Sequence, residues 1–417
     1  MGQEVTVKSQ LDGLYKEVYG DKIEDLIPDV GRLVKKISFR EAEKLGEAFN
    51  VPVIVSDEQG ATYAGPEEDA FDLDPPEAMT TKNAKVKGSQ ILMRAAIGYK
   101  AAAAAVKGGK KAFVNATELV IRRLMNSITK RVEAMLLYGG DGLGEVTSSV
   151  NQGATETTLT IDPKTWAPGL WVGSQKANLE IWDETGPIKV ADVQVGRVDC
   201  KAGTLNVTGL AAQITALDAA LPGTLTVYFK TARGKEALGL AQIIKTSGTL
   251  FGINNNEFDL FKGQEFDALG AALSFDKVTD AVVCAVNYGL DENVTCLVSP
   301  KTWQSLNKDE AALRQYDASF KDDAKKGSRS IVYQGQAGLI EIEAHPMVKE
   351  GEAFIVPMRR LKRVGAYEIS MKTPGHGSEM FRHLESKAAF ELRAYTDQAL
   401  FTEHPSHLVR ISNIVNP

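Results

Sequence analysis

The chain has 417 residues, of which 43% are hydrophobic and 24% are charged, the balance of a folded protein with about two or three domains. Its net charge of -6 excludes a globally basic surface, so we expect DNA to be bound only weakly and non-specifically. No apolar run approaches the length of a membrane span, and we expect no membrane association.

The first 110 or so residues carry too little regular apolar pattern to build a core of their own. We predict a short helix within 21–44, a hairpin whose strands 51–55 and 61–64 meet at Gly60, and a returning strand in QILMRAAIGY at 90–99. Such a segment does not offset its ordering entropy unless something covers its apolar faces. The expected cover is another copy of the same chain.

An acidic, proline-rich stretch, PEEDAFDLDPPEAM, lies between the hairpin and the returning strand. Its acids and prolines exclude a helix or a central strand, so we predict a mobile, solvated loop tip. Five of its acidic side chains are candidates for a contact between subunits, namely Glu67, Glu68, Asp69, Asp72 and Asp74.

The clearest helix is predicted over 111–138. Its apolar residues recur at spacings of three and four, and Arg131 and Glu133 are among the charged residues expected to fall mostly off the apolar face. The helix is a rod of roughly 40 Å. The glycine-rich run GGDGLGE at 139–145 ends it.

The segment 146–233 has the texture of a separate β module. Short alternating runs are divided by Gly, Pro, Asp or Asn, which predicts a small sandwich or barrel with its own core. Three of the four tryptophans, Trp166, Trp171 and Trp182, lie in it. They are either core residues or a surface on which sugar rings stack.

Beyond residue 234 the pattern returns to mixed α and β. We predict a helix over 275–289, a buried strand over 294–298, and a helix start at Ser299 and Pro300, followed by strands to the end of the chain. The predicted fold class is therefore α+β, with a β excursion between the long helix and the rest of the body.

The sequence contains no phosphate loop, nucleophile elbow, zinc-protease motif or dinucleotide-binding motif. We predict no enzyme, no cofactor and no metal site, and a hydrolase is kept only as a remote possibility. His404 and His407 are interpreted as surface histidines, since Pro405 breaks a helix and strand alternation separates them. The three cysteines, Cys200, Cys284 and Cys296, are interpreted as reduced core thiols.

The densest basic cluster is PMRRLKRVG. One interpretation is a charged edge strand that blocks aggregation. The other is a docking site for the acidic stretch of a neighbouring copy, because both signs of charge occur in one chain. The candidate interface residues of this cluster are Arg359, Arg360, Lys362 and Arg363.

The whole chain resembles the tailed-bacteriophage major capsid proteins of the Hong Kong 97 type. The stretches that carry the resemblance are VKGSQILMRAAIGY, ATELVIRRLMNSITKRVEAMLLYG, LVSPKTWQSL, EIEAHPMVKEGEAF, and FELRAYTDQALF followed by HPSHLVRISNIV. The resemblance implies an N-terminal arm, an extended hairpin loop, a spine helix and an inserted small all-β domain. The implied divisions are an N-arm at 1–48, an extended loop at 49–95, a peripheral domain with the spine helix at 96–145, an inserted domain at 146–233, a connection at 234–264, an axial domain at 265–355 and returning peripheral strands at 356–417.

The same resemblance implies a shell subunit that assembles with itself into pentamers and hexamers of an icosahedral head enclosing DNA. The implied location is the virion capsid, assembled in the bacterial host cytoplasm. A separate scaffolding protein and a portal are the implied partners, with a decoration protein as a further one. The alternative left open is a surface adhesin that binds carbohydrate on the tryptophans of the β module.

Overall fold

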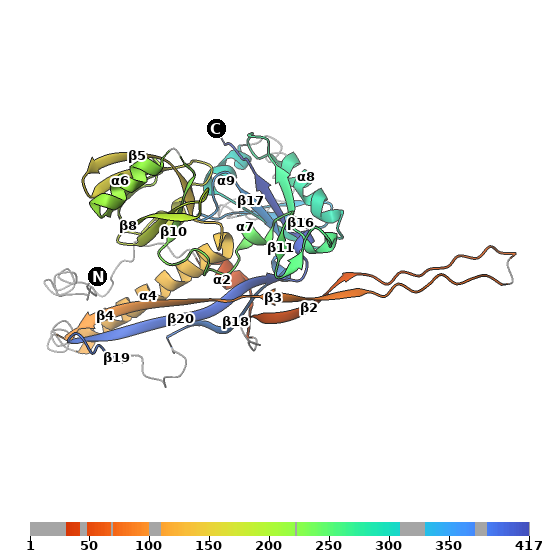
Figure 1. Ribbon diagram of the computed structural model, residues 1–417, viewed down its shortest axis with the longest axis horizontal. Helices are drawn as coiled ribbons and strands as arrows, with labels where there is room; N and C mark the ends of the chain where they lie inside the picture. The colour runs from red at the N-terminus through yellow and green to blue at the C-terminus, as the bar shows by residue number, and fades with distance from the viewer. Residues whose placement is uncertain are drawn as a thin grey trace, which may run out of the picture.

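The computed structural model describes residues 31–41, 48–67, 70–99, 110–221, 223–308, 330–371 and 382–416. Two sheets, one barrel and one long helix form the body, and a thin hairpin projects from it (Figure 1). No helix among the described residues is long and apolar enough to cross a membrane.

The first sheet has five strands and is organised by β20, Ala389–Thr402. β20 pairs antiparallel with β4 along an unbroken register from Ala389↔Gly98 to Gln398↔Ser89, and with β18 on its other side. β4 is the returning strand predicted within 90–99, which is confirmed. The remaining strands of this sheet are β1 (Phe39–Glu41), β4 (Ser89–Gly98), β18 (Leu361–Ser370) and β19 (Arg382–His383).

The long helix α4, Lys110–Tyr138, agrees with the prediction to within one residue. Its middle turns pack Leu124 and Ile128 against Leu392 of the five-stranded sheet. From Val132 to Tyr138 every residue is buried, so its C-terminal end is enclosed on all sides. The only described part of the helix predicted within 21–44 is α2, Arg32–Lys36; its other expected apolar residues, Ile23, Leu26 and Ile27, lie outside the described residues.

The hairpin consists of β2, Phe49–Ser56, and β3, Thr80–Val86, and we call it, together with residues 57–67 and 70–79, the arm. The predicted partner strand at 61–64 is wrong, because Ser56 pairs with Thr80 and a bridge joins Gln59 to Glu77. The pairing with β3 buries Val53, Val55, Ala84 and Val86, whereas 61–64 has no such alternation. The arm therefore continues past Gly60 and projects from the body (Figure 1).

The β module is a closed barrel with the strand order β10-β5-β6-β9-β8-β7. Alternating Leu, Ile and Val side chains fill it, as the sequence pattern predicted for a sandwich or barrel. The barrel includes two helices, α5 (Pro168–Trp171) and α6 (Ala211–Ala220). Its strands are β5 (Gly144–Gly153), β6 (Glu156–Ile161), β7 (Asn178–Asp183), β8 (Ile188–Asp199), β9 (Thr204–Gly209) and β10 (Leu225–Phe229).

The second sheet has six strands in the order β13-β21-β17-β14-β16-β15. Helix α8, Phe275–Val286, covers it with Val278 and Val282, and α9, Pro300–Asn307, starts at Ser299, whose side chain accepts from the Thr302 amide at 3.1 Å. The predicted strand 294–298 and this helix start are confirmed. The strands are β13 (Gln264–Asp267), β14 (Val294–Val298), β15 (Ser330–Gln334), β16 (Leu339–Ala344), β17 (Ala353–Val356) and β21 (Val409–Ser412).

Short elements connect these parts. The return from the barrel passes through α7 (Leu240–Ile243), β11 (Thr249–Leu250), β12 (Ile253–Asn254) and the 3-10 turn η2 (Asp259–Phe261). Two further 3-10 turns, η3 (Met358–Arg360) and η4 (Pro405–His407), lead into β18 and β21. The turn η4 is the point where the chain leaves the five-stranded sheet and enters the six-stranded one.

Candidate subunit-interface site

The far part of the arm is exposed in the single subunit. Glu67, Asp72 and Asp74 are all exposed there, whereas Glu68 and Asp69 lie outside the described residues. Apolar side chains alternate with the acids: Tyr63 is 92% exposed and Leu73 is 77% exposed. The arm thus holds both charge and apolar surface away from its own body.

The basic cluster is largely engaged within the subunit. Arg359 is exposed, but the Arg360 guanidinium pairs with Glu292, and the Lys362 ammonium donates to Glu403 at 2.6 Å. The pKa of Glu403 is lowered, chiefly by this hydrogen bond from Lys362. These two cations therefore hold β18 and its preceding turn to nearby loops.

Arg363 is only 3% exposed and is a structural residue. Its guanidinium donates to the Ile37 carbonyl at 3.0 Å, to Gln398 Oε1 at 3.0 Å and to Glu368 Oε1 at 2.7 Å. β1 pairs in parallel with β18 beside it, and β20 pairs on the other side, so this part of β18 is not an edge strand. Of the four candidate interface residues of this cluster, Arg363 is therefore buried, Arg360 and Lys362 are half-buried with partners within the subunit, and Arg359 is exposed.

The tryptophans of the barrel do not form a sugar-stacking surface. Trp166 and Trp171 are buried and stack on each other, with ring centroids 6.3 Å apart. Trp182 is half-buried, and the Arg233 guanidinium covers its ring at 4.4 Å. The carbohydrate-binding alternative therefore has no structural support.

His404 and His407 lie together, against the prediction that they would be separated. Their rings stack with centroids 5.1 Å apart, and His407 is buried. Burial lowers the pKa of both side chains, and the neighbouring Arg360 cation lowers it further. The prediction fails because the chain forms a 3-10 turn at Pro405, in which side chains do not alternate as they do in a strand.

The expectation that the three cysteines are core thiols also fails in part. Cys296 is buried, but Cys284 is half-buried and Cys200 is exposed.

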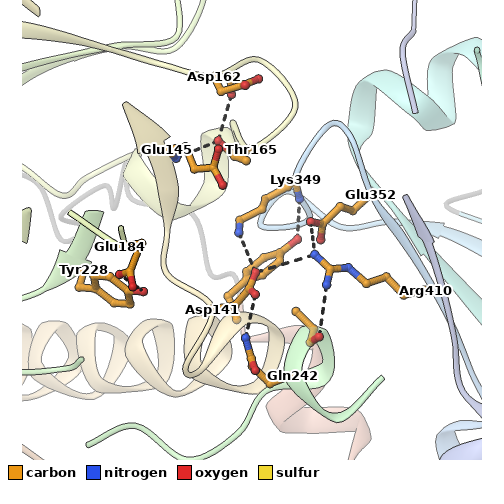
Figure 2. A network of polar contacts seen from close by, with 12 residues as sticks. Asp141, Glu145, Asp162, Thr165, Glu184, Tyr228, Gln242, Lys349, Glu352 and Arg410 are labelled. Carbon is orange, nitrogen blue, oxygen red and sulfur yellow. Dashed lines mark hydrogen bonds and ion pairs between the residues drawn. The ribbon is translucent and has the colours of Figure 1, made fainter. Parts of the chain in front are cut away.

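A buried polar network joins the end of α4 to the six-stranded sheet, and sequence reasoning missed it (Figure 2). Asp141 accepts from Gln242 Nε2 at 2.9 Å and faces Lys349 Nζ at 3.3 Å and Arg410 at 3.9 Å. Arg410 in turn donates to Glu352 at 2.6 Å. Burial opposes the ionisation of Asp141, but Lys349 and Arg410 outweigh it, so its pKa lies below the ordinary value.

A second buried network, also missed, anchors the segment before β1. The carboxylate of Glu133 accepts from the backbone amides of Leu33, at 2.6 Å, and Val34, at 2.9 Å, at the start of α2. His345 Nε2 lies 2.9 Å from the same carboxylate, and both side chains are 0% exposed. Because the Met347 amide donates to Nδ1 of His345, the ring proton is on Nε2 and His345 donates to Glu133.

No local sequence signal identifies the partners within either network. Glu133 was expected on the polar side of the helix, and the partners of Glu133 and of Asp141 lie about a hundred residues or more away in the sequence. The one available signal is the apolar run around Glu133 in VEAMLLY, which has no polar face and therefore indicates a helix end that is enclosed on all sides.

Neither a protein-family model nor a curated protein matches the chain. Among solved structures it is similar to the Cyanophage A-1(L) capsid asymmetric unit, with a TM-score of 0.53 at 12% identity over 98% of this chain and 98% of that chain. A capsid of the native GTA particle aligns with a TM-score of 0.49 at 10% identity, over 99% of this chain and 100% of that one. The chain therefore has the α+β fold of a phage capsid protein, the fold that its resemblance to the Hong Kong 97 type predicted.

Proposed function

We propose that this chain is the major capsid protein of a tailed bacteriophage, a shell subunit that performs no catalysis. It assembles with itself into pentamers and hexamers of an icosahedral head that encloses DNA. The observation that carries the proposal is an arm that projects from a body with a capsid fold and exposes apolar side chains that this body does not cover.

The mechanism is geometric. Each subunit lays its arm over a neighbour, which buries side chains such as Tyr63, Phe71 and Leu73 that are exposed in the single chain. Burial of a large apolar side chain contributes about 1.5–3 kcal/mol, from which the cost of ordering the arm is subtracted. The free energy of each contact between subunits is modest, and a closed shell contains many such contacts at once.

The proposal includes the partners and divisions that the resemblance implies. A separate scaffolding protein and a portal take part in assembly in the host cytoplasm, and a decoration protein is a further partner. The barrel is the inserted domain. Packaged DNA is held non-specifically, in keeping with the net charge of -6. Among the candidate interface residues, the proposal keeps the exposed acids of the arm, Glu67, Asp72 and Asp74, together with Arg359.

Electron microscopy tests the proposal directly. The chain is expressed alone and with a candidate scaffolding protein, and we expect closed shells of uniform diameter in at least one sample. A control variant, in which an Asn-Gly turn replaces residues 57–79, is expected to stay folded by circular dichroism and to form no shells. A wild-type chain that stays monomeric in every condition contradicts the proposal.

A further inference from the structure

A pocket of about 350 Å³ lies between the start of β4 and one end of the barrel. Residues 89–93 of β4 line one side, and the turn after β10 lines the other, together with Arg131 of α4 and Asn178 of β7. The pocket is open to solvent, because Thr231 and Lys235 of this turn are exposed. The proposed shell function makes no use of this site.

Positive charge collects on the lining of the pocket. Arg131 comes from α4, and Lys230 and Lys235 come from the turn after β10. Glu236 is the only acid among the described residues of the lining. Even with Glu236 ionised, the lining keeps an excess of two positive charges, and burial raises the pKa of Glu236, which favours its neutral form.

The guanidinium of Arg131 is held in one orientation. It lies 3.3 Å from the centroid of the Phe229 ring, which covers one face of the cation and leaves the edge with its N–H donors. Glu236 faces Arg131 and acts on it through its charge, but the Glu236 carboxylate accepts a hydrogen bond from the backbone amide of Gly140. No hydrogen bond between Arg131 and Glu236 is found within the described part of the chain, so the donor edge of Arg131 is left for a ligand.

Neutral donors add to these cations. Asn178 Oδ1 accepts from Gln194 Nε2 at 3.3 Å, which leaves the NH2 group of Asn178 as a donor. Thr231 has a φ of 66°, a left-handed conformation that costs most for a β-branched residue. It is the only β-branched residue among the described non-glycine residues with positive φ. Backbone strain of this kind clusters at binding sites, where a side chain is kept for its contacts with a ligand.

The ligand that fits this lining is a phosphate group with two negative charges. Its tetrahedral oxygens accept hydrogen bonds on several sides, so it can meet donors from α4, β7 and the turn at once. A carboxylate is planar and carries one charge, which leaves part of the excess positive charge unmatched. The pocket is larger than a phosphate ion, and Phe229 and Met93 supply apolar surface beside an organic group attached to the phosphate.

We propose that this pocket binds a dianionic phosphate group, either inorganic phosphate or the phosphate monoester of a small organic molecule. The phosphate lies between Arg131 and the turn that carries Thr231 and Lys235. A bound ligand therefore joins the barrel to β4. The proposal goes beyond the shell function and does not depend on it, because one subunit holds the whole site.

Isothermal titration calorimetry of the full-length chain tests the proposal. The probes are sodium phosphate and adenosine monophosphate, with sodium chloride at equal ionic strength as the blank. Lys235→Ala and Arg131→Gln are each expected to weaken the binding of both probes about tenfold, since each variant removes a charge-assisted hydrogen bond. Lys308→Ala, at an exposed lysine at the end of α9, is the matched control and is expected to bind like the wild type.

Thr231→Gly separates a binding role of this residue from a structural one. Glycine adopts positive φ without strain, so the midpoint of thermal unfolding is expected not to fall. The affinity for phosphate is expected to fall in the same variant, because the hydroxyl group is lost. In the wild type, phosphate is expected to slow hydrogen exchange both in residues 89–93 and in residues 230–236, which lie on opposite sides of the pocket.

The outcomes decide the proposal without reference to assembly. Weaker binding in Lys235→Ala and Arg131→Gln supports it, and a higher affinity for adenosine monophosphate than for phosphate identifies the monoester as the better ligand. Equal phosphate binding in the wild type and in both variants indicates an adventitious ion only and overturns it, as does the absence of binding by either probe at millimolar concentration. Duplex DNA without terminal phosphates is the third probe. If DNA alone binds, and Lys235→Ala weakens this binding, the lining contacts backbone phosphodiesters and the proposal is overturned.

Discussion

Replacing Glu133 by Gln tests whether this buried carboxylate holds α2, and the strand β1 that follows it, to the body of the protein. Oε2 of Glu133 accepts only from the Val34 amide, and Oε1 accepts from Leu33 and from His345. A glutamine loses least when its NH2 group faces Val34, which removes one charge-assisted hydrogen bond and leaves the partly buried Val34 amide without this acceptor. The expected cost is about 2 kcal/mol.

Hydrogen exchange of the peptide that covers α2 and β1 measures this cost. A loss of about 2 kcal/mol lowers the protection of these amides about thirtyfold if they open as a unit. Glu145→Gln, an exposed glutamate at the start of the barrel, is the matched control and is expected to leave the protection unchanged. Equal protection in Glu133→Gln and the wild type refutes the anchoring role of the carboxylate.

Three further predictions concern the junctions of the fold. The folded state lowers the pKa of Asp141, so the stability that this carboxylate contributes is present above about pH 4 and is lost as the pH falls. Asp141→Asn is therefore expected to lower the midpoint of urea unfolding at neutral pH. In the same variant the midpoint is expected to decline less steeply toward about pH 3 than in the wild type. The pKa values of His404 and His407 are also lowered, and because the unfolded chain takes up the protons first, stability is expected to fall as the pH drops below 6.5; the double Asn variant removes this fall in thermal melts at a series of pH values. A Cβ at Gly139 would lie 2.0 Å from the Ala237 carbonyl oxygen. Gly139→Ala is therefore expected to lower the free energy of unfolding by about 3 kcal/mol or to yield insoluble protein. Gly153→Ala, whose Cβ meets nothing within 4 Å, is the control and is expected to be neutral in the same urea titration.

Sequence reasoning succeeded where the signal is local. The spacing of Val120, Leu124 and Ile128 specifies α4, and the pair Ser299 and Pro300 specifies the start of α9. The returning strand at 90–99 and the barrel strands carry alternation within a few residues. These elements can therefore be predicted from the sequence without knowledge of the elements that they pack against.

Sequence reasoning failed where the structure depends on partners that are distant in the sequence. The Gly60 turn signal favoured a short hairpin, but the strand 80–86 supplies the apolar alternation that β2 buries. Glu133 and Arg363 look like surface charges in the sequence, and their amide, histidine and carbonyl partners come from segments far along the chain. For the candidate interface, composition identified the acidic arm, but it did not show that Arg360, Lys362 and Arg363 have partners within the subunit.

The order of the strands along the chain has a consequence for protein synthesis. β20 lies between β4 and β18, and β21 lies between β13 and β17, and each is made after both of its neighbours, so neither sheet closes before this strand has left the ribosome. A nascent chain therefore carries its arm before its own two sheets are complete. Under the proposed shell function, a nascent subunit offers no finished body to a neighbour's arm until both strands are made.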